Sequence, residues 1–286
     1  MKKALAFSLL ALNLYSAEFA LSFGVHDMIV PNAKPLSQTI YEVDGSGRDS
    51  HTLGVNVALH GKSDPDSLVL QEGHFRVLRD YDIDELDPDH IPIWFLGEYE
   101  AKIPFYSIQN YGRFLADLDI SGKANTVSCV ERLTRFFTGI KYESPKEKKL
   151  YFDASLLFGR YALEIDDDTP AMRGYTRESL KEINFAGSLK LNVAYDFTKD
   201  FSAYTTLQTW QSSSETLEKY VKVGFNYDTN EFLKGSKLYL EASYNWYNLD
   251  AYQRPGLMPI LPWHEDMLIN TYLKIPVNLE SLFAKK

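Results

Sequence analysis

The residues best suited to acid–base chemistry in this chain are its histidines. There are six: His26, His51, His60, His74, His90 and His264. A serine nucleophile needs a base within hydrogen-bond reach, and no histidine stands in a His-x-Ser pair, which would put both side chains on one face of a strand. His60 and Ser63 are three residues apart and would face opposite sides of a strand. The spacing predicts no catalytic residue, and a hydrolase would need a histidine brought to a serine or aspartate by the fold.

An acidic run between residues 80 and 89 is the second place where chemistry could occur. Asp80, Asp82 and Asp84 stand at every second position, as at the start of a calcium-binding loop. Such a loop requires a glycine at its sixth position and a glutamate at its twelfth, where this chain has Glu85 and Ile91. The pattern therefore predicts a solvated acidic loop, with weak bridging by divalent cations to surface lipopolysaccharide as the alternative. We expect neither a tight metal site nor a cofactor.

The remaining candidates are charged side chains that recur at every second position of apolar segments. In the clearest segment, Ile183 to Phe197, the odd-numbered residues are apolar or aromatic apart from Gly187, and the even-numbered ones are small or polar. Strands place successive side chains on opposite faces, so the segment predicts a strand. It exceeds the usual strand length of about five or six residues. A tilted strand that crosses a bilayer needs about 9–11.

Alternation of the same kind predicts about twelve strands in all. The other segments span residues 19–25, 37–43, 51–61, 91–106, 113–120, 136–142, 150–158, 201–207, 221–227, 238–247 and 267–277. Short connections alternate with long ones, as they do in a membrane barrel with turns at one end and loops at the other. The long connections are residues 61–90, 121–134, 165–181, 211–218 and 248–266. This rhythm closes only if 37–43 is a strand and 44–50 is its turn.

Composition excludes several classes of protein. The chain has 286 residues, a net charge of −9, 45% hydrophobic residues and a mean hydropathy of −0.27. Its aromatic content argues against disorder, the single Cys129 excludes a disulfide scaffold, and the lack of a basic surplus argues against nucleic acid as a partner. After residue 14 no apolar run approaches the ~18 residues of a membrane helix. A soluble β-protein and a membrane barrel remain, and in a barrel alternation dilutes the apolar residues.

The N-terminus has the order of a secretory signal. Lys2 and Lys3 precede an apolar stretch that reaches Leu14, and small residues follow from Ser16 to Ala20. We therefore predict a signal peptide over residues 1–17, cleaved between 16 and 20, and a single barrel domain over 18–286. The chain is expected to be exported.

Three features favour the membrane over a soluble β-sandwich. The apolar faces of the best segments carry no charge, and their opposite faces are rich in small and polar residues. Aromatic residues gather near segment ends, as in the girdles of membrane barrels. The expected fold is all-β, an antiparallel transmembrane β-barrel of about twelve strands.

In signal peptide, alternation and loop rhythm, the whole mature chain resembles Gram-negative outer-membrane β-barrel proteins. Its size and strand count are similar to those of twelve-stranded substrate-specific channels of the nucleoside-channel or oligosaccharide-channel type. The resemblance implies an outer-membrane location, contact with lipid and lipopolysaccharide, and passive passage of a small polar solute. Such proteins usually end in an aromatic residue, whereas Phe283 is followed here by three more residues. Outer-membrane proteases carry an Asp-x-His pair, whereas His264 here precedes Asp266.

Charged residues of the alternating segments are the candidates for a solute path along the lumen. They are Glu98, Glu100, Lys102, Arg113, Asp117, Asp119, Arg135, Lys141, Asp153, Lys190, Lys222, Glu241 and Lys274. Acids concentrate in residues 98–153 and three lysines follow in later strands, so we expect a field across the pore. The predicted function is a narrow channel for a small polar or charged solute. A barrel hydrolase and a structural or surface-interaction barrel with a plugged lumen are the alternatives. Solute and oligomeric state stay open.

Overall fold

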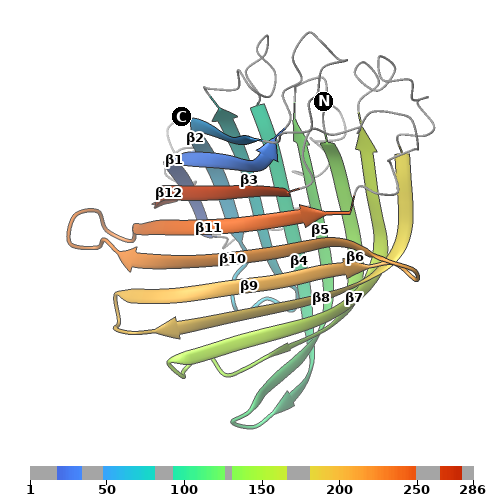
Figure 1. The fold of residues 1–286 in the computed structure, drawn as a ribbon. Coiled ribbons are helices and arrows are strands. Elements are labelled where there is room, and N and C mark those ends of the chain that lie inside the picture. Colours follow the sequence, from blue (N-terminus) through green and yellow to red (C-terminus); the bar gives the residue numbers. More distant parts are fainter. Residues whose placement is uncertain are drawn as a thin grey trace, which may run out of the picture.

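The computed structural model describes residues 18–33, 48–80, 93–125, 131–165, 181–248 and 265–278. Twelve strands form one closed antiparallel barrel, in which each strand pairs with its chain neighbours and β1 pairs with β12 (Figure 1). The strands are β1 (Glu18–Ala33), β2 (Arg48–Lys62), β3 (Leu70–Asp80), β4 (Ile93–Ile108), β5 (Gly112–Asn125), β6 (Glu131–Glu143), β7 (Leu150–Ile165), β8 (Lys181–Asp196), β9 (Phe201–Gln211), β10 (Thr216–Asp228), β11 (Lys237–Tyr247) and β12 (Glu265–Val277). The predicted all-β barrel of twelve strands is confirmed.

The barrel has two distinguishable ends. Short connections at residues 63–69, 109–111, 144–149, 197–200 and 229–236 lie at one end, which we call the turn end. The opposite end, which we call the loop end, holds the four-residue connection between β9 and β10. Asn110 lies in the tightest turn with φ 66°, a left-handed conformation that asparagine tolerates. In outer-membrane barrels the short turns face the periplasm.

Two predicted connections are wrong, although the strand count is right. Residues 61–90 are not one long loop, because β3 occupies Leu70–Asp80 after a short turn. Residues 211–218 contain only a four-residue turn, in which the Ser212 hydroxyl accepts hydrogen bonds from the backbone N–H groups of Ser214 and Glu215. The predicted strand at 37–43 lies outside the described residues, as do the signal peptide, most of the acidic run and His264.

The outer wall of the barrel is mostly apolar. The residues predicted to face away from the lumen are exposed, for example Leu189, Val223 and Leu240. A continuous exposed apolar surface of this kind is unusual for a soluble monomer and fits a lipid environment. No helix in the described ranges has both the length and the apolar character needed to span a bilayer.

Aromatic rings form a girdle on the outer wall at the turn end. Phe114 lies 6.3 Å from Tyr106 and 5.2 Å from Tyr142, measured between ring centroids. Farther round the barrel, Phe201 stacks on Phe225 with centroids 6.0 Å apart and planes 4° from parallel. Rings in this position match the interfacial girdles of membrane barrels.

Candidate functional site in the lumen

Strand alternation turns every predicted path residue toward the lumen, and their access to solvent differs widely. The side chain of Glu98 is 67% exposed and that of Lys222 is 29% exposed, whereas that of Lys141 is 4% exposed. Most of the other path residues form ion pairs or hydrogen bonds with neighbouring side chains on the inner wall. Their contacts divide the lumen into three groups of residues, which lie at different heights along the barrel.

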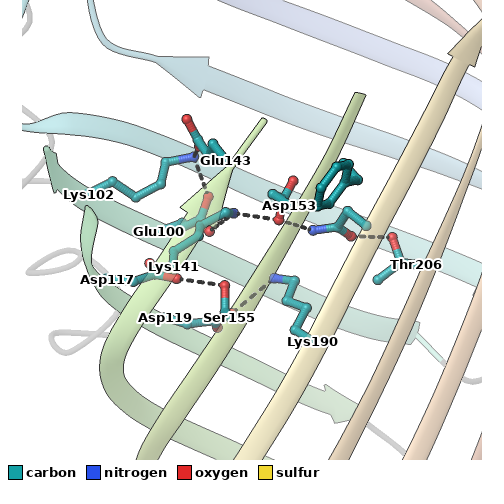
Figure 2. Close-up of polar contacts among 12 residues, drawn as sticks. Glu100, Lys102, Asp117, Asp119, Lys141, Glu143, Asp153, Ser155, Lys190 and Thr206 are labelled. Carbon is teal, nitrogen blue, oxygen red and sulfur yellow. Dashed lines mark hydrogen bonds and ion pairs between the residues drawn. The ribbon is translucent and has the colours of Figure 1, made fainter. Parts of the chain in front are cut away.

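The first group lines the wall toward the turn end, and Figure 2 shows the ion pairs that join Glu100, Lys102, Lys141 and Asp153. The Lys141 ammonium lies 2.7 Å from Glu100 Oε1 and 3.1 Å from Asp153 Oδ1. Lys102 Nζ lies 2.7 Å from the other oxygen of Glu100. Because these residues come from β4, β6 and β7, the pairs connect strands that are not all neighbours. We call Glu100, Lys102, Arg113, Lys141, Glu143 and Asp153 the turn-end network.

The contacts of the turn-end network extend to β5 on one side and to β8 on the other. Arg113 donates to Glu143 Oε2 from Nη2 at 2.7 Å and from Nε at 2.9 Å. On the other side, Asn192 donates to Asp153 Oδ1 at 2.8 Å. Lys190 lies 3.0 Å from Asp119 Oδ2. The segment predicted to be an acidic wall therefore carries its own paired bases, which reduces any field across the pore.

The second group surrounds Glu241 on β11. Its Oε1 accepts hydrogen bonds from the hydroxyls of Tyr204 at 2.5 Å and Tyr272 at 3.1 Å. Arg76 Nη2 lies 3.6 Å from Oε2, and Lys222 Nζ lies 3.9 Å from Oε1. A Cβ at Gly224, beside this group, would come 2.4 Å from the Tyr204 ring, so glycine at that position makes room for the ring.

The third group closes part of the lumen near the loop end, and we call it the loop-end layer. Its members are Trp94, Lys123, Arg135, Tyr161, Trp210, Glu218, Tyr247 and Asp266. Lys123 Nζ donates to Tyr247 Oη at 3.0 Å and lies 3.0 Å from Asp266 Oδ2. Because β5 and β11 are six strands apart in a ring of twelve, the contact between Lys123 and Tyr247 crosses the lumen.

The other ion pair of the loop-end layer is deeply buried. Arg135 pairs with Glu218, whose side chain is fully buried and also accepts a hydrogen bond from Tyr161 Oη at 3.0 Å. The Arg135 guanidinium lies 4.2 Å from the centroid of the Trp210 ring, within the range of a cation–π contact. Buried apolar side chains such as Leu133 and Phe137 pack around these residues. The layer thus resembles a small protein core placed inside the barrel.

A serine–histidine pair is present in space although it is absent from the sequence pattern. Ser22 Oγ and His60 Nε2 are 2.7 Å apart, and the His60 ring stacks on His74 with centroids 4.3 Å apart. His74 Nδ1 lies 3.6 Å from Glu98 Oε2. Ser22 is 0% exposed, so its hydroxyl cannot reach a substrate in this arrangement. The described residues hold no group of three side chains that could bind a metal ion.

Several lumen residues are absent from the set predicted from the sequence. Arg76 and His74 were missed because β3 was assigned to a loop. Lys123, Glu218 and Asp266 were missed because each lies near a strand end, where predicted bounds stopped short. The same alternation places Lys123, Glu218 and Asp266 inside once their strands are extended to the observed ends, and Arg76 and His74 inside once β3 is recognised as a strand.

No family model matches the sequence, and no curated protein matches it. Solved structures do match. An outer membrane channel from Pseudomonas putida F1 has a TM-score of 0.50 and 10% identity, covering 91% of this chain and 95% of that chain. The KdgM porin has a TM-score of 0.45 and 10% identity, covering 90% of this chain and 99% of that chain. Outer membrane phospholipase A from Escherichia coli has a TM-score of 0.43 and 10% identity, covering 92% of this chain and 97% of that chain.

At 10% identity these likenesses concern the fold alone. The chain has the fold of Gram-negative outer-membrane channel-type barrels, as its sequence pattern predicts. One fold can host unrelated functions, so function has to be argued from the lumen.

Proposed function

We propose that this protein is an outer-membrane channel through which a small polar or charged solute passes along the lumen. The observation that carries the proposal is the exposure of Glu98 and Lys222, which point inward from the middle of β4 and β10. Charged side chains keep such exposure inside a closed barrel only where water reaches them. A wetted, charged middle within an apolar outer wall is what a path for polar solutes requires.

The loop-end layer is the narrow part of this path. Lys123 reaches across the lumen to Tyr247, and its long side chain can swing away at the cost of its charged hydrogen bonds to Tyr247 and Asp266, about 1.5–3 kcal/mol each. The buried pair of Arg135 and Glu218 joins β6 to β10 in the same layer, on the strands next to those of Lys123 and Tyr247. We infer that a solute passes beside this pair when Lys123 moves.

A structural barrel with a plugged lumen is the second candidate, and the loop-end layer is the observation that favours it. If the loop-end layer fills the cross-section of the lumen and the contact between Lys123 and Tyr247 never opens, the lumen conducts nothing. A hydrolase is less favoured, because in the described residues the serine found to contact a histidine is Ser22, and its hydroxyl is buried.

Conductance in planar bilayers separates the two candidates. We expect the wild-type protein to conduct ions weakly and Lys123→Ala combined with Tyr247→Ala to conduct severalfold more, because the two substitutions remove the contact that crosses the lumen. Trp246→Ala is the matched control, because Trp246 is the neighbour of Tyr247 on the opposite face of β11. If neither the wild type nor the double variant conducts ions, the plugged barrel is established.

The membrane location is tested separately. The apolar outer wall and its aromatic girdle support lipid as the immediate partner of the barrel, with lipopolysaccharide as a further one. We expect the protein to fractionate with the outer membrane and to change its gel mobility on heating. Recovery as a soluble periplasmic protein would contradict the proposal.

A further inference from the structure

We propose that the middle of the lumen selects zwitterionic solutes, with the solute's ammonium group at Glu98 and its carboxylate at Lys222. The inference rests on the proposed channel function and adds a substrate class to it. Three observations support it: the accessibility of these two charges, the occupation of the neighbouring charges by other partners, and the placement of the two strands in the ring.

Glu98 is an acid that faces the lumen without being enclosed by bases. Its nearest ionisable partner is His74, 3.6 Å away on β3, and 67% of its side chain stays exposed. Other inward acids differ: Glu100 has two lysines at 2.7 Å, and Glu143 has an arginine at 2.7 Å. Glu98 can therefore accept a solute cation without losing an existing lysine or arginine partner.

Lys222 is the corresponding base. Its contact with Glu241 is long, at 3.9 Å, and Glu241 already has Tyr204, Tyr272 and Arg76 as closer partners. Lys190, the nearby alternative, is engaged by Asp119 at 3.0 Å. Lys222 thus has an ammonium group that is partly exposed and weakly paired, and it can approach a solute anion.

The barrel sets the two groups opposite each other. β4 and β10 are six strands apart in a ring of twelve, so Glu98 and Lys222 face each other across the lumen. They attract one another through space, yet they form no direct ion pair within the part of the chain that the structure describes. A gap between two accessible opposite charges is left for a solute.

Such a gap discriminates by charge pattern. A zwitterion gains at both walls, whereas a simple cation or anion gains at one wall and is repelled at the other. A neutral solute gains at neither. The preferred solute carries an amine and a carboxylate at the two ends of a short chain.

Swelling of proteoliposomes tests this class with ω-amino acids, from glycine to 6-aminohexanoate. We expect them to enter the wild-type vesicles about fivefold faster than neutral hydroxyamides of equal length, the contribution of about one partly exposed ion pair. One chain length should be optimal, because it matches the gap. Equal rates for zwitterions and neutral solutes would overturn the inference.

Charge exchange gives the sharper readout. Glu98→Gln and Lys222→Met should each abolish most of the zwitterion preference, and the exchanged pair Glu98→Lys with Lys222→Glu should restore it. Lys219→Met is the control, because Lys219 lies on the same strand but faces outward over Trp246. If the variant with the exchanged pair does not prefer zwitterions over neutral solutes, the inference is contradicted. Wild-type vesicles closed even to small neutral solutes would instead contradict the channel itself.

Discussion

The turn-end network and the loop-end layer are built from the same kinds of ion pair, yet they do different things to the lumen. The network runs along the wall from β4 to β7, and each of its charges has its partners on nearby strands. The loop-end layer crosses the lumen and surrounds its charges with Trp94, Trp210 and Tyr247. Charges spread along the wall leave the lumen open, whereas charges packed among aromatic rings narrow it.

The two regions also differ in redundancy. Glu100 in the network has both Lys102 and Lys141, so the loss of one lysine leaves a partner. Glu218 in the layer has Arg135 as its ion-pair partner in the described chain, with a tyrosine hydroxyl beside it. When a buried charge has one counter-charge, removal of that counter-charge is strongly destabilising. The comparison therefore predicts a graded series of stability losses.

Arg135→Ala should have the largest effect on stability. It leaves Glu218 buried without a counter-charge, and the expected loss is about 3–5 kcal/mol of unfolding free energy. Urea unfolding in lipid vesicles, followed by gel mobility, measures it. Arg135→Ala combined with Glu218→Leu should recover most of the loss, since the uncompensated charge is gone. A loss below about 1 kcal/mol in the single variant would contradict the difference between the regions.

Lys141→Met should have an intermediate effect. It removes charged hydrogen bonds to Glu100 and Asp153, but Lys102 and Asn192 still bind those carboxylates. We expect a loss of about 2 kcal/mol by the same unfolding assay. A loss equal to that of Arg135→Ala would show that Lys102 and Asn192 do not compensate for the missing Lys141 ammonium group.

Arg113→Ala should have the smallest effect. The Arg113 side chain is 34% exposed, and Glu143 retains Lys102 at 3.6 Å. An ion pair screened in this way contributes about 0–1 kcal/mol. The difference between variant and wild type should shrink further in high salt, because salt screens accessible charges. A salt-independent loss above this range would show that the turn end is as dry as the loop-end layer.

Alternation along the chain was enough to predict much of this protein. A period of two, with apolar residues at one parity, predicts strands, and it correctly sorted the inward from the outward face of β8, β10 and β11. It failed at β3, where a run of turn-forming residues precedes a segment with polar Gln71 and Arg79 on the outward face. Alternation predicts a strand only where apolar and polar residues differ clearly between the two faces, and in β3 that difference is small.

The inner wall of this barrel was readable from sequence because side-chain direction along a strand is a local property. Which inner side chains meet was not readable, because that depends on barrel closure and on the relative register of distant strands. Lys123 and Tyr247 are separated by 124 residues and touch across the lumen. The sequence by itself determined which charges face inward. Only the tertiary structure decided that Arg135 would be locked against Glu218, and that Glu98 and Lys222 would stay open to water.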